Sequence, residues 1–311
     1  MGYTYEKNLR HPEGRVDVVL DTDAFNEIDD QFAISYLVHV PEKAEVKAFY
    51  AAPFFNSHSS GPKDGMEKSY EEIKKVLVLN GREDLLNCVY PGSDRYLPDE
   101  QTPVDSPAAR DLAERAMQYS ADRPLYVLAI GAITNVASAL LMKPEISERI
   151  VIVWLGGNAY WCRDTKEFNM MQDIAAARII FNAEAALVQL PCRGVVEDLR
   201  TTKPELEYWL RNRNPISDYL SRNTIQEAEH FSPYKTWSRT IWDISTVAWL
   251  VGQGRQFMDE EIFPAPLPEY DYTYSFDENR RPVLCVTHID RDAIFADLIA
   301  RLTELKTRSD V

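Results

Sequence analysis

Short apolar runs alternate with amphipathic segments along most of the chain. The apolar runs, rich in Val, Ile and Leu, occupy 18–20, 46–52, 125–130, 150–155 and 186–190. Runs of this length, bounded by turn residues, are typical of buried strands. Between them apolar residues recur with helical spacing, as in Phe32, Ala33, Tyr36 and Leu37. The alternation predicts an α/β fold with a mostly parallel central sheet and helices on both faces, in an open Rossmann-like arrangement.

Polar residues gather where these predicted strands end. They are Asp21 and Asp23, then Asn56, then the segments 131–135 and 156–158. Because ligands bind beyond the carboxyl ends of the strands in such a sheet, we expect these segments to line one pocket. Carboxylates, amides and backbone carbonyls are the oxygen ligands that Ca²⁺ or Mg²⁺ prefers. The sequence therefore predicts a metal or polyol site at this edge of the sheet.

The most acidic turn lies between the first predicted strand and the helix after it. This turn carries Asp21, Asp23, Asp29 and Asp30. Four carboxylates so close in sequence repel one another unless a cation, a hydrogen-bond network or a shared proton offsets their charge, which favours a hard divalent metal. The alternative interpretation is a solvated loop in which Asn26 caps the helix and Asp29 interacts with the helix dipole.

Composition and charge limit the partners. The 311 residues have a formal net charge of −15, with 45% hydrophobic and 27% charged residues, and we expect a single globular domain over 1–311. The charge disfavours a nucleic-acid backbone or an anionic membrane as partner and favours the binding of cations. The start of the chain shows no signal peptide or transmembrane segment, and no metal-ligand spacing connects Cys88, Cys162, Cys192 and Cys285. We therefore expect a reduced, cytoplasmic protein.

Five short motifs follow one another along the chain. They are Asp21-Thr22-Asp23 followed by Asp29-Asp30, Ile130–Asn135, Leu155–Gly157, Glu167–Asn169 with Asp173, and Trp242-Asp243. In this order they resemble the motifs of the inosine-uridine nucleoside hydrolase family, and the resemblance covers about 16–250. The chain departs from the family pattern twice. Two extra residues separate Asp23 from Asp29, and Trp242 stands where the family commonly has His.

The resemblance implies a Ca²⁺-dependent N-ribohydrolase that cleaves a ribonucleoside, or a related N-riboside, into ribose and free base. By this resemblance, Ca²⁺ would be bound by Asp23, Asp30, Asp243 and the backbone carbonyl of Ile130. The sugar would be bound by Asp29, Asn56, Glu167 and Asn169, with Asp21 behind the metal ligands. Asp23 would also be the general base for the attacking water. Family members are usually dimers or tetramers, so we expect a homodimer or homotetramer.

Departure of the base requires a proton donor, or a base that leaves readily without one. Trp242 cannot donate a proton at neutral pH, which excludes the route through a His beside the chelating Asp. Other candidate donors or base-contacting residues are His58, His230 and Tyr234, although a lone His in a loop is more often structural. Trp242 itself either stacks on the base or belongs to the core.

Two other functions are compatible with part of the pattern. An apolar strand followed by Asp-x-Asp also opens haloacid-dehalogenase-like Mg²⁺ phosphatases, in which Asp21 would be the nucleophile and Asp23 the acid/base. Phe25 disfavours this interpretation because that class has Thr or Val there, and the Asp29-Asp30 pair has no role in that scheme. The second alternative is a ribose- or nucleoside-binding protein that has kept the carboxylates and lost catalysis, which Trp242 and the longer first loop suggest.

Overall fold

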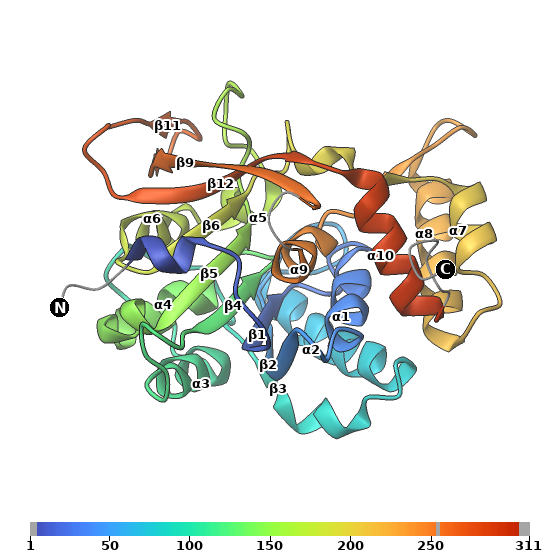
Figure 1. Ribbon diagram of the computed structural model, residues 1–311, viewed down its shortest axis with the longest axis horizontal. Helices are drawn as coiled ribbons and strands as arrows, with labels where there is room; N and C mark the ends of the chain where they lie inside the picture. The colour runs from blue at the N-terminus through green and yellow to red at the C-terminus, as the bar shows by residue number, and fades with distance from the viewer. Residues whose placement is uncertain (1–4, 253–255, 305–311) are drawn as a thin grey trace.

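An eight-stranded sheet forms the centre of the computed structural model, which describes residues 5–252 and 256–304 (Figure 1). From edge to edge the strands are β3 (Val89–Pro91), β2 (Ala44–Ala51), β1 (Val16–Thr22), β4 (Leu125–Ala129), β5 (Ile150–Leu155), β6 (Ala186–Leu190), β12 (Pro282–Ile289) and β9 (Met258–Pro264). Neighbouring strands are parallel except for β12 and β9, which are antiparallel. The prediction of an α/β fold with a mostly parallel sheet is confirmed.

Helices cover both faces of the sheet (Figure 1). One face is covered by α1 (Asp30–Val38), α2 (Pro62–Leu79) and α9 (Ile244–Val251), and the other by α3 (Pro107–Ala116), α4 (Thr134–Met142) and α6 (Ile174–Asn182). Further helices are α5 (Phe168–Gln172), α7 (Lys203–Trp209), α8 (Pro215–Phe231) and α10 (Arg291–Thr303). Two small antiparallel sheets pair β7 (Arg200–Thr201) with β8 (Arg239–Thr240) and β10 (Leu267–Pro268) with β11 (Tyr274–Ser275).

The central strands are apolar on both sides because both faces of the sheet are covered. In β1, Val18 and Leu20 belong to the core that includes α1, α2 and α9, whereas Val19 belongs to the core that includes α3, α4 and α6. Alternate residues of a strand point to opposite faces, so one continuous apolar run contributes to both cores. The register pairs Asp21 with Ala129, which brings the acidic turn after β1 beside the turn after β4.

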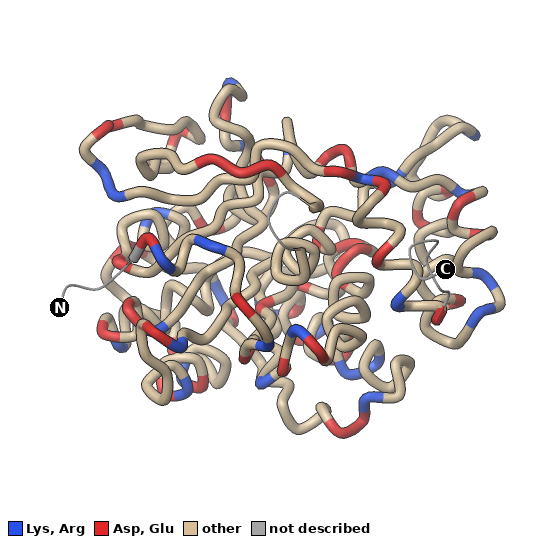
Figure 2. The backbone as a smooth tube through the Cα atoms, viewed as in Figure 1, with Lys and Arg blue, Asp and Glu red and all other residues tan. Residues whose placement is uncertain are grey.

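The edge strand β9 has no counterpart among the elements expected from the sequence. It carries Asp259, Glu260 and Glu261 in succession, so it lacks the apolar run by which the other strands are recognised. Figure 2 shows the acidic run along β9. Charged side chains hinder pairing of an edge strand with another chain, so this composition suits the edge of the sheet.

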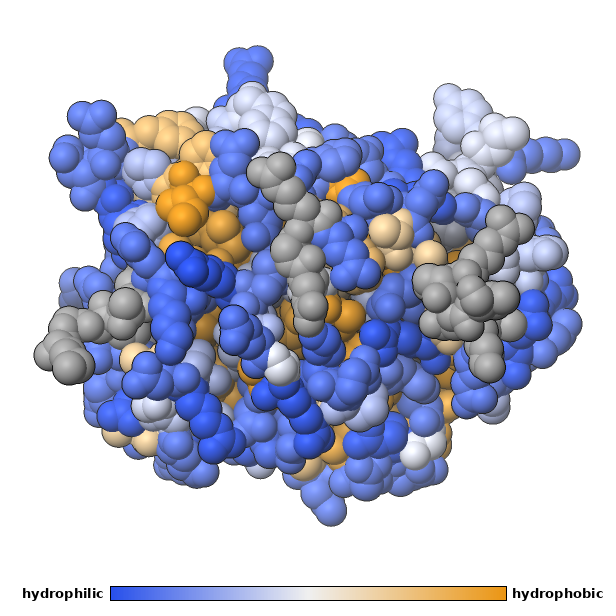
Figure 3. All heavy atoms as spheres, viewed as in Figure 1, coloured by the Kyte–Doolittle hydropathy of each residue, from blue (hydrophilic) through white to orange (hydrophobic). Residues whose placement is uncertain are grey.

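One face of the molecule is mainly polar. The face drawn in Figure 3 is predominantly hydrophilic and carries only small, separate apolar patches, as is normal for a globular protein. Within residues 5–252 and 256–304, no helix combines the length and the apolar character that crossing a membrane requires.

Candidate active site

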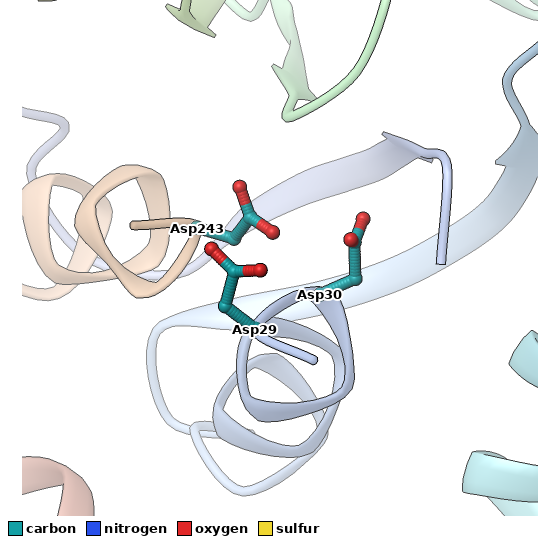
Figure 4. Close-up of side chains that lie close together, drawn as sticks. All are labelled: Asp29, Asp30 and Asp243. Atoms are coloured by element: carbon teal, nitrogen blue, oxygen red, sulfur yellow. The ribbon is translucent and has the colours of Figure 1, made fainter. Parts of the chain in front are cut away.

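Three buried carboxylates converge where two helices begin (Figure 4). Asp29 and Asp30 lie at the start of α1, and Asp243 lies at the start of α9, which packs against α1. One oxygen atom from each carboxylate lies within 4.8 Å of the other two. Because the positive ends of two helix dipoles meet here, the backbone favours negative charge at this position.

Hydrogen bonds orient two of the three carboxylates. The Thr22 hydroxyl donates to Asp30 Oδ1 over 2.5 Å, and the backbone N–H of Trp242 donates to Asp29 Oδ2 over 3.0 Å. Burial raises the pKa of Asp30 to about 7. Burial, followed by repulsion between neighbouring carboxylates, raises the pKa values of Asp29 and Asp243 well above the usual range. Protons or a cation are therefore needed to offset the charge of this group.

Asp23 lies beside this group, against the turn between β4 and α4. A Cβ atom added to Gly131 would lie 3.0 Å from Asp23 Oδ1. Both oxygens of the Asp23 carboxylate are buried and have no hydrogen-bond partner among the described residues. Burial, followed by repulsion from the neighbouring carboxylates, raises its pKa well above the usual value. Asp21 differs from Asp23 because it accepts a hydrogen bond from Asn135 Nδ2 over 2.8 Å.

Asn169 and Glu167 connect the ends of β4 and β5. Asn169 Nδ2 donates to the carbonyl of Ile130 over 3.2 Å and to the carbonyl of Leu155 over 3.0 Å. The Glu167 carboxylate caps α5, where it accepts two backbone N–H groups, and it accepts the N–H of Gly157 over 2.8 Å. Glu167 therefore holds the loop after β5 to the start of α5 and positions Asn169.

A cavity of about 320 Å³ lies at these strand ends. The predicted site residues that line it are Asp23, Asp29, Ile130, Glu167, Asn169, Trp242 and Asp243. The other lining residues are Asn26, Glu27, Leu155, Asn158, Lys166, Phe168, Cys192, Arg193 and Glu197. The cavity thus combines carboxylates, amides and one indole, and it lies where a parallel sheet is expected to bind its ligand.

Sequence reasoning missed three acidic or nucleophilic residues of this cavity: Glu27, Cys192 and Glu197. Cys192 and Glu197 follow the carboxyl end of β6, so the rule that indicated the other strand ends also applies to them. Glu27 lies in the acidic turn itself. The Cys192 thiol is buried, and burial, followed by the nearby Glu167 carboxylate, raises its pKa well above the usual value.

The longer loop at 24–28 packs against the protein and forms part of the cavity wall. Ala24, Asn26 and Ile28 are buried, and only Phe25 is exposed, at 40%. The backbone N–H of Asn26 donates to the Asp23 carbonyl over 2.7 Å, which closes a turn. The two extra residues are therefore accommodated without separating the three carboxylates of Figure 4.

Five of the predicted site residues do not line the cavity. Asp30 lies behind its wall beside Asp29 and Asp243, and the other four are Asn56, His58, His230 and Tyr234. Asn56 Nδ2 donates to Asn26 Oδ1 over 2.6 Å, and His58 Nδ1 lies 2.8 Å from the Asn26 carbonyl, so both support the longer loop. His230 is exposed near the end of α8, and Tyr234 is 72% exposed. A role for His58, His230 or Tyr234 in protonating or contacting the base requires that residue to move toward the cavity.

A family model described as inosine-uridine preferring nucleoside hydrolase matches residues 18–296 of this chain. The chain belongs to this family. The membership predicted from the five motifs is confirmed, and so is the prediction that the protein is an enzyme. The family assignment excludes the haloacid-dehalogenase-like alternative. The non-specific ribonucleoside hydrolase RihC of Salmonella paratyphi C is 25% identical, over 82% of this chain and 85% of that protein. RihC of Escherichia coli is also 25% identical, over 76% of this chain and 79% of that protein.

Solved structures of nucleoside hydrolases share this fold. The plant nucleoside hydrolase PpNRh1 superposes with a TM-score of 0.75 at 21% identity, covering 93% of this chain and 99% of that one. The purine-preferring ribonucleoside hydrolase from Gardnerella vaginalis superposes with a TM-score of 0.73 at 19% identity, covering 93% of this chain and 98% of that one. The nucleoside hydrolase-like architecture is thereby confirmed.

The donors in this nucleoside hydrolase suit a hard divalent cation. Carboxylate and carbonyl oxygens are the preferred ligands of Ca²⁺, and both Asp23 oxygens are buried and accept no hydrogen bond from the residues that the structure describes. The Ile130 carbonyl uses one of its two lone pairs for Asn169, which leaves the second available. The structure groups Asp29 with Asp30 and Asp243, whereas the resemblance names Asp23 as the third carboxylate ligand and assigns Asp29 to the sugar.

The raised pKa values of the buried carboxylates predict how the stability of the metal-free enzyme depends on pH. Burial raises the pKa of Asp21 and of Asp30 to about 7, above the value of about 4 in an unfolded chain. Between these values the folded state binds more protons, so the free energy of unfolding falls as the pH rises from about 4 to about 7. In EDTA we expect a lower Tm at pH 8 than at pH 5, measured by scanning calorimetry. Added Ca²⁺ should raise Tm more at pH 8; a Tm in EDTA that rises with pH would contradict this account.

Gly131 allows Asp23 to lie close to the turn after β4. In Gly131→Ala the new methyl group would lie 3.0 Å from Asp23 Cγ and Oδ1 and 3.1 Å from Ala52 Cβ, so the carboxylate must shift by a few tenths of an ångström. We expect kcat for ribose release to fall about tenfold, because small displacements of reacting groups are costly. Gly61→Ala is the matched control, because its added methyl meets no atom within 4 Å. Equal activity of the two variants would show that the position of Asp23 is not critical.

Proposed function

We propose that this protein is a Ca²⁺-dependent nucleoside hydrolase that cleaves the N-glycosidic bond of a ribonucleoside, or a related N-riboside, to ribose and free base. The family assignment and the ribonucleoside hydrolases among its relatives support this activity. The observation that carries it is the convergence of buried carboxylates from two helix starts on a cavity that also contains Asn169 and the Ile130 carbonyl.

The proposed metal ligands are Asp23, Asp30, Asp243 and the backbone carbonyl of Ile130. When bound, Ca²⁺ supplies positive charge that offsets the repulsion of the carboxylates and favours deprotonation of an attacking water. Asp29 lies close enough to Asp30 and Asp243 to share the same ion or to bind a sugar hydroxyl beside it.

The remaining steps are assigned to residues of the chain. Asp23 accepts the proton of the attacking water, because its buried carboxylate lines the cavity and none of the described residues donates a competing hydrogen bond to it. Asp29 and Asn169 orient the ribose hydroxyls. Negative charge on the surrounding carboxylates stabilises the positive charge that develops at C1′ as the C1′–N bond breaks. Glu167 acts on the sugar mainly by positioning Asn169, since three backbone N–H groups already occupy its carboxylate.

The enzyme is further proposed to be cytoplasmic and to form a homodimer or homotetramer. All four cysteines are free, which is expected in a reducing compartment. No nucleic-acid or membrane partner is proposed, because the net charge of −15 would repel both.

The activity is tested by measuring reducing-sugar release from uridine, cytidine, inosine and adenosine, with Ca²⁺ and after chelation. We expect ribose release that requires the metal. Tight binding of a nucleoside without release would favour a binding protein that has lost catalysis. Phosphate release from phosphorylated substrates, without ribose release, would overturn the proposed reaction.

A further inference from the structure

The cavity contains little that could protonate a departing base. Trp242 occupies the position before Asp243, and the described lining residues include no His and no Tyr. The Cys192 thiol is a poor acid because burial and the neighbouring Glu167 carboxylate raise its pKa. Lys166 and Arg193, the two cations among the described lining residues, are exposed. A base that leaves without being protonated would suit this cavity better than one that needs a general acid.

The lining is strongly acidic even outside the proposed metal ligands. Glu27 and Glu197 add two carboxylates to those of Asp23, Asp29, Glu167 and Asp243. Glu27 is only partly neutralised, because its partner Arg239 is shared between two carboxylates.

Arg239 Nη2 lies 2.8 Å from Glu27 Oε2 and 3.2 Å from Glu227 Oε1, so this trio keeps a net negative charge. Arg239 also lies three residues before Trp242, which ties Glu27 to the segment that presents the indole. A negative potential near an aromatic face is the arrangement by which proteins recognise cations that cannot donate hydrogen bonds.

We propose that the preferred substrate is an N-riboside whose leaving base carries a fixed positive charge, such as an N-ribosylpyridinium. This substrate class rests on the ribohydrolase activity proposed above. Trp242 would contact the cationic ring through its π-face, and Glu27 and Glu197 would attract the charge. Both residues are part of the cavity, and Trp242 is half-buried.

The reaction then needs no acid for the leaving group. Water oxygen bonds to C1′ while the C1′–N bond breaks, and the electron pair of that bond passes to the ring nitrogen. The positive ring leaves as a neutral pyridine. Asp23 takes the proton from water and later returns it to solvent, so the products are ribose, pyridine and one proton.

The test compares N-ribosylpyridinium with uridine as substrates of the full-length, Ca²⁺-loaded enzyme. Glu27→Gln and Trp242→Leu should each lower kcat/KM for the pyridinium substrate about tenfold, mainly by raising KM. The loss of kcat/KM for uridine should be several times smaller. Raising the ionic strength from about 20 mM to about 500 mM should lower kcat/KM for the cationic substrate alone. Glu261→Gln, which removes an exposed carboxylate on β9 outside the cavity, is the matched control and should change neither.

Equal losses for both substrates in Glu27→Gln, or uridine hydrolysis without pyridinium hydrolysis, would overturn the inference and leave the proposed function standing. If neither substrate releases ribose, the proposed function fails, and calorimetric titration with N-ribosylpyridinium decides the inference separately. Weaker binding to Glu27→Gln than to the unmodified enzyme would support recognition of the cation. Absence of binding to both would overturn it.

Discussion

Asp243→Asn is expected to lower kcat for ribose release by about a thousandfold or more. Asp243 is buried and shares its position with Asp29 and Asp30, so replacing its carboxylate by an amide removes a negative charge from the centre of the proposed metal site. The same change should lower the affinity for Ca²⁺ at least about tenfold, because a neutral amide oxygen is a poorer ligand than a carboxylate. Both effects are measured by titrating Ca²⁺ while following reducing sugar.

A matched control lies on β1. Asp17→Asn changes a carboxylate at the opposite end of the strand from Asp21, where Asp17 accepts a hydrogen bond from Tyr119 over 2.9 Å. This variant should keep the activity and Ca²⁺ requirement of the unmodified enzyme. Normal Ca²⁺ dependence in Asp243→Asn would remove Asp243 from the metal site.

Asp23→Asn is expected to lower kcat by about a thousandfold because it removes the proposed general base. The pH profile of the residual activity should lose the dependence on deprotonation of this carboxylate. In EDTA at pH 8 the variant should be more stable than the unmodified protein, because it removes a buried charge whose oxygens have no hydrogen-bond partner among the described residues. Scanning calorimetry and initial rates measure the two effects.

Asp21→Asn tests whether the loss in Asp23→Asn comes from the general base itself or only from removing one negative charge from this turn. Asp21 is also buried, but its carboxylate accepts a hydrogen bond from Asn135 and does not line the cavity. We expect a smaller loss of activity than in Asp23→Asn. Full activity of Asp23→Asn, or an equal loss in both variants, would contradict the assignment of Asp23 as base.

The central sheet could be predicted because its strands are continuous apolar runs. The predicted strands at 150–155 and 186–190 coincide with β5 and β6. The edge strand β9 could not be recognised, since its acidic residues remove the apolar signal and its pairing with β12 depends on a contact distant in sequence. Local pattern thus predicts strands buried on both faces better than edge strands.

The site was partly predictable for a related reason. Polar residues at strand ends indicated one pocket, and the family resemblance added Asp243, which lies beside Asp29 and Asp30 in the structure. Sequence could not show that Asn56 and His58 contact the longer loop, because those hydrogen bonds depend on the conformation of the loop at 24–28. Nor could it show that backbone N–H groups occupy Glu167, which follows from the geometry of α5.

The most direct test of the account is a crystal structure of the enzyme grown with CaCl₂, with anomalous scattering used to locate the ion. We expect an ion about 2.3–2.6 Å from carboxylate oxygens of Asp23, Asp30 and Asp243 and from the Ile130 carbonyl oxygen. An ordered carboxylate group without an ion, in crystals grown with saturating Ca²⁺, would contradict it.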